Sequence, residues 1–213
     1  MEDKEASRLH ASAPVTIYNI MLLGAGGVGK TSFVTALYGK EFNSQYTPTQ
    51  PFGDDLPPMS YILSHSTTTN IFNDLYDPKR QCYFIVHDYP GTYEYESLDF
   101  HQNLMKRMDG FIIMVDLGRP KLTGATVEYF EKIAIDATKN ENIPIIVCGN
   151  KCDITTRTAG YTHVTDWFRE EMQDGDPKNL RYKCIISCKK RKNLDLPFQM
   201  MLKTIRPFTG MHK

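Results

Sequence analysis

Continuous apolar runs alternate with stretches of helical periodicity along most of the chain. The first run, Val15–Leu23, is rich in β-branched and other apolar residues, which is typical of a buried strand, and Lys30–Tyr38 then repeats its apolar residues at helical spacing. We expect further strands at Tyr61–Ser64, Ile71–Asp77, Cys82–Val86, Phe111–Leu117, Ile143–Cys148 and Lys183–Ile186. We expect further helices at Leu98–Met108, Thr123–Lys139, His163–Met172 and Leu196–Ile205. This alternation predicts an α/β fold with a mostly parallel sheet and helices on both faces.

The polar segments between these elements do not divide the chain into two domains. Residues 1–13 are polar and aperiodic, so we expect a flexible N-terminal arm, then a single domain at 14–207 and a short tail at 208–213. Phe42–Ser60 is rich in Pro, Gly, Asp and Thr and is predicted to be loop. A chain of 213 residues is long enough for one such domain with a core of its own.

The segment Gly24–Thr31 (GAGGVGKT) fits the pattern G-x-x-x-x-G-K-[ST] between a predicted strand and a predicted helix. Glycines let the backbone wrap around a phosphate chain with its N–H groups pointing inward, and the helix N-terminus adds positive potential. Lys30 would neutralise the β- and γ-phosphates, and Thr31 would supply a hydroxyl to Mg²⁺. The phosphate-binding residues predicted here are Gly26, Gly27, Val28, Gly29, Lys30, Thr31 and Ser32.

A second short motif, Asp88-Tyr89-Pro90-Gly91, closes the strand predicted at Cys82–Val86. Asp88 could hold Mg²⁺ directly or through water, and the Gly91 N–H could meet a γ-phosphate. The pattern D-x-x-G is common in turns, but ligands of open parallel sheets bind beyond the carboxyl ends of the strands, which is where this motif lies.

Two further motifs, Asn150-Lys151-Cys152-Asp153 and Ser187-Cys188-Lys189, also follow predicted strands. The Asp153 carboxylate can accept two hydrogen bonds from guanine, at N1 and at the exocyclic amino group, a donor pair that adenine lacks. Asn150 can tie this loop to the phosphate loop, and the Lys151 stem can lie over the purine. A backbone N–H in the segment 187–189 would close the other side of the base. Asp153 therefore favours a guanine nucleotide over the ATP of a kinase or ATPase.

Together these residues resemble the Ras-like small GTPases over about residues 15–207, with Gly24–Thr31, Thr49, Asp88–Gly91, Asn150–Asp153 and Ser187–Lys189 in the family's order. The resemblance implies a three-layer P-loop fold that binds GTP and GDP with Mg²⁺ and hydrolyses GTP. It implies two switches, at 42–50 and 88–100, where an effector, a GTPase-activating protein and an exchange factor would bind. It also implies catalytic roles for Lys30, Thr49, Gly91 and Thr92, and magnesium ligation by Thr31, Thr49 and Asp88; Thr47 is the alternative to Thr49.

The sequence departs from the family at Thr92, where most members have the glutamine that orients the attacking water. Threonine is shorter and has no amide, so we expect slow hydrolysis that needs an activating partner. The alternative is a non-catalytic GTP- or GDP-bound interaction module, or a subunit of a larger assembly. A second departure is the 39 positions between Thr49 and Asp88. A plain hairpin needs only about 20, so residues 51–80 hold either a partner-binding element or a longer hairpin.

Charge is balanced overall, with 25 basic and 25 acidic residues, but ten basic residues and one acidic residue lie between Lys178 and the C-terminus. The simplest interpretation is a solvated basic face; the run Lys189–Lys192 resembles a nuclear signal but overlaps the base-binding loop. Neither Glu2 nor the residues near the C-terminus indicate a lipid anchor. We therefore expect a cytoplasmic protein with no nucleic-acid partner, which contacts membrane only through a partner or its basic C-terminal region.

Four of the five cysteines form two equally spaced pairs, Cys148 with Cys152 and Cys184 with Cys188. This spacing raises the possibility of a zinc site. However, Cys148 and Cys184 each lie in a very apolar run, where a free cysteine behaves as a small core residue. We therefore predict core packing rather than metal binding.

Overall fold

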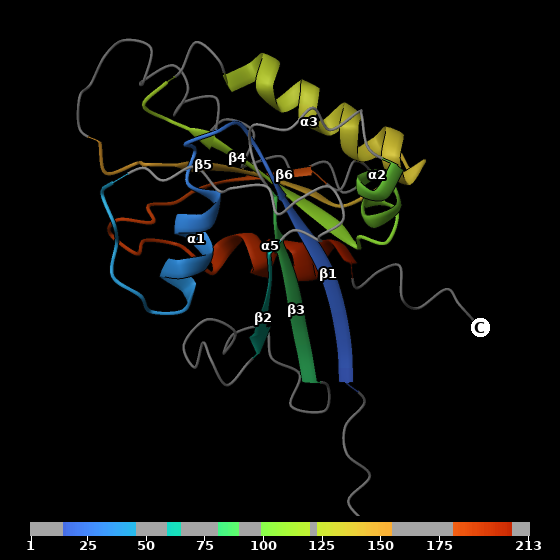
Figure 1. Cartoon of the computed structure of the whole chain (residues 1–213), viewed down its shortest axis with the longest axis horizontal. Helices are drawn as coiled ribbons and strands as arrows, with labels where there is room; N and C mark the ends of the chain where they lie inside the picture. Colours follow the sequence, from blue (N-terminus) through green and yellow to red (C-terminus); the bar gives the residue numbers. More distant parts are fainter. Residues whose placement is uncertain are drawn as a thin grey trace, which may run out of the picture.

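A six-stranded sheet in the order β2-β3-β1-β4-β5-β6 forms the centre of the molecule (Figure 1). The computed structural model describes residues 15–45, 59–64, 81–89, 99–119, 123–154 and 181–205. The strands are β1 (Val15–Leu23), β2 (Met59–Ser64), β3 (Gln81–Asp88), β4 (Gly110–Asp116), β5 (Ile145–Asn150) and β6 (Arg181–Ile185). Only β2 runs antiparallel to its neighbour, and the other five strands pair in parallel. The predicted mostly parallel sheet is confirmed.

Helices cover both faces of this sheet and complete the predicted three-layer α/β fold. They are α1 (Lys30–Leu37), α2 (Asp99–Met105), α3 (Thr123–Thr138) and α5 (Leu196–Ile205). In Figure 1, α1 and α5 lie on one face, and α2 and α3 lie on the other. Because five strands are parallel, their carboxyl ends meet along one edge of the sheet, where ligands of this fold class bind.

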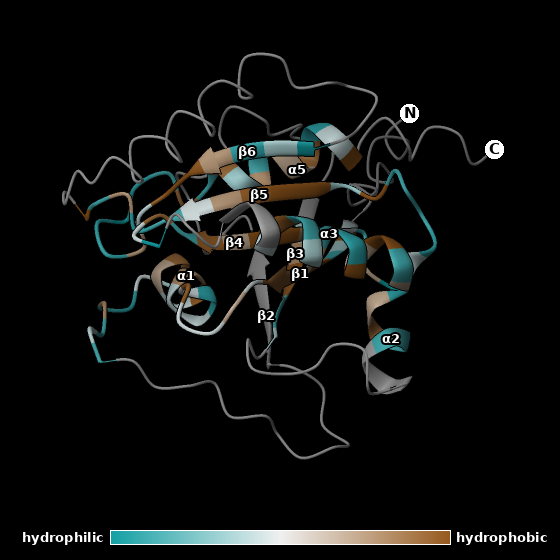
Figure 2. Ribbon diagram, turned by 90° about the horizontal axis from the view of Figure 1, so that it is seen from above, coloured by the Kyte–Doolittle hydropathy of each residue, from teal (hydrophilic) through white to brown (hydrophobic). Residues whose placement is uncertain are grey.

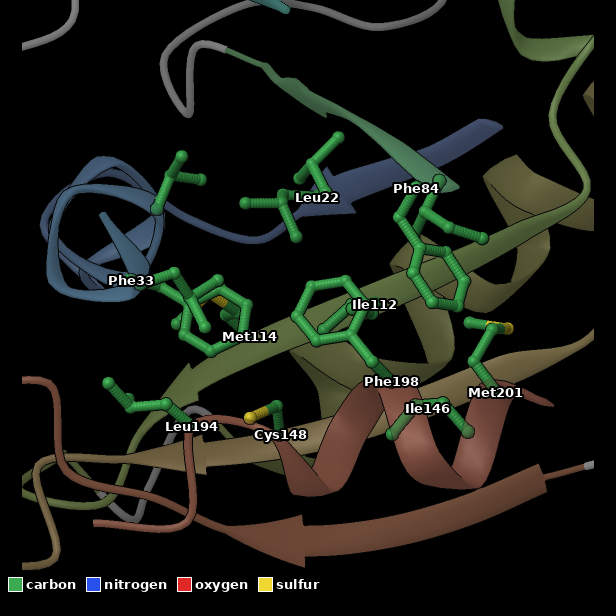
Figure 3. Close-up of a cluster of buried hydrophobic side chains, with 14 of the residues drawn as sticks. Leu22, Phe33, Phe84, Ile112, Met114, Ile146, Cys148, Leu194, Phe198 and Met201 are labelled. Atoms are coloured by element: carbon green, nitrogen blue, oxygen red, sulfur yellow. The ribbon is translucent and has the colours of Figure 1, made fainter. Parts of the chain in front are cut away.

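The core between the sheet and the pair α1 and α5 is built around three buried phenylalanines (Figure 3). The ring of Phe198 stacks on Phe33, with centroids 5.8 Å apart, and meets Phe84 at 5.1 Å. Aromatic pairs at these distances add to the free energy gained by burying their apolar area. They connect α1, α5 and β3, so the N-terminus of α1 is held at a fixed place relative to the strand ends.

The second core, between the sheet and the pair α2 and α3, uses the alternate residues of the same strands. Phe111 and Ile113 of β4 are fully buried there, as are Met105 of α2 and Ala134 of α3. Figure 2 shows the consequence for the sheet: β5 is hydrophobic along most of its length, whereas β6 at the edge carries hydrophilic segments. Strands buried on both faces explain why the sequence shows continuous apolar runs rather than alternation.

Most predicted elements are confirmed, with ends that differ by a few residues. Val15–Leu23 and Leu196–Ile205 agree with β1 and α5. The predicted loop Phe42–Ser60 is wrong at its end, because Met59 and Ser60 already belong to β2 and pair with β3. The expectations for 1–13, for Ile71–Asp77 and the rest of 51–80 apart from β2, for His163–Met172 and for 208–213 fall outside the described residues.

The strand predicted at Ile143–Cys148 is shifted by two residues. Ile143 is in a turn, with its N–H donating to Asn140, and the following Pro144 has no N–H to donate. At the other end, Asn150 is paired with Asp116 of β4 and is therefore the last residue of β5. Asp88 likewise ends β3 rather than following it, since it is paired with Leu22. Both site candidates are thus anchored in the sheet itself.

Candidate functional site

The phosphate-loop candidate Gly24–Gly29 joins β1 to α1, as predicted. Three of its glycines have positive φ, namely Gly24 at 141°, Gly27 at 77° and Gly29 at 101°. Gly29 is the N-cap of α1 and places no side chain on the helix end. No side chain caps this helix end, and a helix N-terminus with its first-turn N–H groups favours an anion.

Gly24 is required for the contact between this loop and β4. A Cβ at Gly24 would lie 2.4 Å from the backbone oxygen of Met114, whereas a Cβ at Gly39, also at positive φ, would meet nothing within 4 Å. We expect Gly24→Ala to lower the free energy of unfolding by about 2–4 kcal/mol, and Gly39→Ala by about 1 kcal/mol. Chemical denaturation of both variants tests this; equal losses would contradict the close approach.

Lys30 and Asp88 are two buried charged residues near the start of α1. The Lys30 ammonium donates to the carbonyl oxygens of Gly24 at 2.7 Å and Ala25 at 3.1 Å. Burial lowers the pKa of Lys30 to about 8, against the opposing attraction of Asp88. Burial also raises the pKa of Asp88. Each charge is poorly solvated, so an anion brought to Lys30 or a cation brought to Asp88 would relieve a desolvation cost.

The oxygens of Thr31 and Asp88 fit a magnesium site. Thr31 Oγ1 donates to Asp88 Oδ2 at 2.6 Å, which brings a hydroxyl and a carboxylate together. The other carboxylate oxygen, Asp88 Oδ1, is buried and has no hydrogen-bond partner among the described residues. A buried carboxylate oxygen without a donor needs a ligand, and hard oxygen donors are those that Mg²⁺ prefers.

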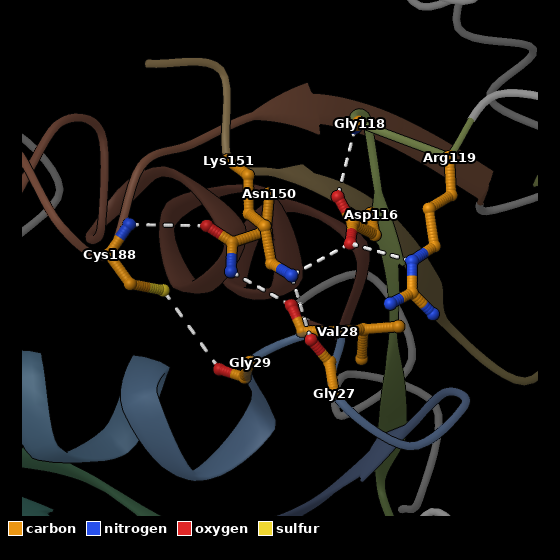
Figure 4. A network of polar contacts seen from close by, with 9 residues as sticks. All are labelled: Gly27, Val28, Gly29, Asp116, Gly118, Arg119, Asn150, Lys151 and Cys188. Atoms are coloured by element: carbon orange, nitrogen blue, oxygen red, sulfur yellow. Dashed lines mark hydrogen bonds and ion pairs between the residues drawn. The ribbon is translucent and has the colours of Figure 1, made fainter. Parts of the chain in front are cut away.

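A polar network links the end of β5 to the phosphate loop and to the loop after β6 (Figure 4). Asn150 Nδ2 donates to the Val28 oxygen at 2.9 Å, and Asn150 Oδ1 accepts the Cys188 N–H at 3.1 Å. Beside it, Ser187 Oγ donates to Asp153 Oδ1 at 2.5 Å. Asn150 is therefore the junction of the three loops, and Asp153 is held by one oxygen with the other available.

These loops enclose a cavity of about 530 Å³, a size suited to a small-molecule ligand. Eleven sequence-predicted residues line it: Gly26, Gly27, Gly29, Lys30, Thr31, Ser32, Asn150, Lys151, Asp153, Cys188 and Lys189. Val28, Asp88 and Ser187 do not line it but are hydrogen-bonded to residues that do. The predicted residues Thr49, Gly91 and Thr92 lie outside the described part of the chain.

Several cavity residues carried no signal in the motifs. Thr35, Lys40, Glu41 and Ile154 line the cavity, as does Phe42 at the start of the predicted first switch. Phe42 and Ile154 belong to the few large apolar side chains that are exposed among the described residues, at 44% and 37%. Exposed apolar groups in a concave site are typical of ligand contacts, but only the fold reveals that they share one cavity.

The four cysteines do not form a metal site with one another. Cys148 and Cys184 are fully buried core residues on neighbouring strands, as predicted, with their sulfurs 3.7 Å apart. Burial raises the pKa of Cys188 to about 12, so this thiol at the cavity wall stays neutral. Among the described ranges, no cluster of three or more histidine, cysteine or acidic side chains could hold a metal ion.

Two further findings bear on the protein as a whole. In the part of the chain that the structure describes, no helix combines the length and the apolar character needed to cross a membrane. Compared with models of known protein families, residues 19–207 match the Ras family. The match covers every strand, helix and cavity residue described above except the first part of β1.

Proposed function

Because this chain belongs to the Ras family of GTP-binding small GTPase switches, we propose that it binds GTP and GDP with Mg²⁺ in the 530 Å³ cavity and hydrolyses GTP slowly. The observation that carries the proposal is the placement of two chemistries on one cavity. The phosphate loop with Lys30, and the residues Asn150 and Asp153 after β5, line the same cavity.

The phosphates would be bound by the N–H groups of the first turn of α1 and by the Lys30 ammonium, which would exchange its two carbonyl partners for phosphate oxygens. Thr31 and Asp88 would hold the metal, with Thr49 as a further ligand from the first switch. Mg²⁺ supplies neutralisation of the charge that develops on the phosphate oxygens. The Gly91 N–H would assist at the γ-phosphate.

The base would lie between Phe42, the Lys151 stem and the loop 187–189. The hydrogen bond from Ser187 Oγ fixes the Asp153 carboxylate, which would then accept the N1 and amino protons of guanine. Adenine lacks those two donors, so a bound adenine would leave Asp153 Oδ2 without a partner. The free-energy cost of that unpaired oxygen would make the site select guanine over adenine.

Slow hydrolysis follows from Thr92, which cannot orient water as a glutamine does. We expect Thr92→Gln to raise the single-turnover rate of GTP hydrolysis by at least about tenfold, because the water would then be aligned for attack. Thr92→Ala serves as the control and should change the rate by less than about twofold. A Thr92→Gln protein that binds Mg²⁺ and GTP but hydrolyses at the wild-type rate would contradict the catalytic proposal.

That outcome would favour the second candidate, a non-catalytic GTP- or GDP-bound interaction module or a subunit of a larger assembly. Thr92 and the enlarged segment 51–80 motivate it. In either case we propose that the switches at 42–50 and 88–100 bind an effector, a GTPase-activating protein and an exchange factor. We place this role in cytoplasmic signal transduction.

A further inference from the structure

Asp116 is a largely buried acidic residue that none of the sequence motifs includes. It is the last residue of β4, at the same edge of the sheet as Asn150, with which it is paired. Its side chain is only 9% exposed, and its Oδ1 accepts the Gly118 N–H at 2.9 Å. Asp116 does not line the 530 Å³ cavity. A carboxylate this buried is stable only with a hydrogen-bonding or charged partner, and the identity of that partner indicates the role of Asp116.

That partner is Lys151, whose ammonium lies between two fixed oxygens (Figure 4). Lys151 Nζ donates to Asp116 Oδ2 at 2.7 Å and to the Gly27 oxygen of the phosphate loop at 2.9 Å. The side chain of Lys151 is 31% exposed, and Lys151 lines the cavity. Its backbone has φ 68°, a conformation that a residue other than glycine adopts only when its surroundings hold it.

We infer that Asp116 is a positioning residue that slows nucleotide release by holding Lys151 across the purine side of the cavity. A lysine side chain loses rotamer entropy when it is fixed in one conformation. Because Asp116 already holds Lys151 in the free protein, binding of the nucleotide does not have to order this side chain. Through the same ammonium, Asp116 also holds the Gly27 carbonyl and so connects β4 to the phosphate loop. The inference rests on the proposed function.

The test measures release of a fluorescently labelled GDP in the presence of Mg²⁺. We expect Asp116→Ala to raise the dissociation rate roughly tenfold and Asp116→Asn, which keeps an acceptor without the charge, roughly threefold. The association rate should change by less than about twofold, since Asp116 does not touch the ligand. Arg119→Ala is the matched control: Arg119 approaches the same carboxylate at 3.8 Å but is 69% exposed, so we expect less than a twofold change.

A double-mutant cycle separates positioning from general stability. Lys151→Met keeps the apolar stem and removes the ammonium, so in that background Asp116→Ala should raise the dissociation rate by less than about twofold. Should Asp116→Ala fail to fold, the same cycle with Asp116→Asn gives the answer. A wild-type rate in the single variant, or the full increase with Lys151 already changed, overturns the inference. A wild-type chain that binds no labelled GDP instead overturns the proposed function.

Discussion

The Asp153→Asn variant is expected to lose GDP affinity by a factor of about 100 or more and to prefer xanthosine diphosphate. One oxygen of the Asp153 carboxylate accepts a hydrogen bond from Ser187 Oγ. The carboxylate can also accept the hydrogen bonds from N1 and the amino group of guanine. An asparagine presents an NH₂ group to one of those donors, and an unpaired buried group costs about 1–3 kcal/mol in addition to the lost charge-assisted bond. Xanthine has a carbonyl in place of the amino group and matches the amide.

Competition against labelled GDP by unlabelled GDP, ADP and xanthosine diphosphate measures this change. Ser187→Ala provides a matched comparison, because it releases Asp153 from its partner without changing the carboxylate. It should weaken GDP binding by a smaller factor, about tenfold, and give no gain for xanthine. If Asp153→Asn keeps the wild-type preference for GDP, the base lies elsewhere and the guanine assignment is wrong.

The second large effect concerns Lys30. Its ammonium lies on the phosphate loop at 2.7 Å from the Gly24 oxygen, where it would transfer to phosphate oxygens. We expect Lys30→Gln to lower GDP affinity about 100-fold, since a largely buried charge-assisted contact is lost. Equilibrium binding of labelled GDP gives the number; a loss under about threefold would contradict the role.

The pKa of Lys30 adds a pH dependence with a defined sign. Burial lowers the pKa of Lys30 to about 8 in the nucleotide-free chain, and bound phosphates would raise it. At pH 7 both forms carry the proton, and by pH 8 about half of the free molecules have lost it, so over this range affinity should fall by only about twofold. Above pH 8 the free protein must take up a proton to bind, and affinity should fall with rising pH, approaching tenfold per pH unit. Lys30→Gln should lack this slope, and a wild-type affinity that rises from pH 8 to pH 9 would contradict it.

Much of the fold follows from the sequence because central strands such as β4 and β5 are buried on both faces and therefore have continuous apolar sequences. The site motifs were predictable because ligands of parallel sheets bind at the carboxyl ends of the strands. The motif Gly24–Thr31 follows β1, and the motif Asn150–Asp153 begins at the end of β5. The limits of β5 were not predictable from the sequence. Ile143 is a residue type that favours strands, and only its hydrogen bond to Asn140 and the following Pro144 keep it out of the sheet.

What the sequence could not supply were contacts between distant segments. Asp116 ends an apolar run without a motif, and its role depends on Lys151, 35 positions away. Phe42 has the sequence context of an ordinary loop residue, and only the fold shows that it lines the same cavity as Asp153 and Ile154. Residues of this kind act through their placement, and placement is set by the packing of α1, α5 and the sheet rather than by local pattern.

The most direct test of the central claim is to denature the purified protein and identify the released nucleotide by chromatography. Tight binding of a guanine nucleotide predicts close to one GDP per chain, or GTP if hydrolysis is stalled, with little adenine nucleotide. GDP would indicate turnover during expression, and intact GTP would favour the non-catalytic module. Adenine nucleotide in equal amount, or no nucleotide together with no binding of added GDP, would contradict the account.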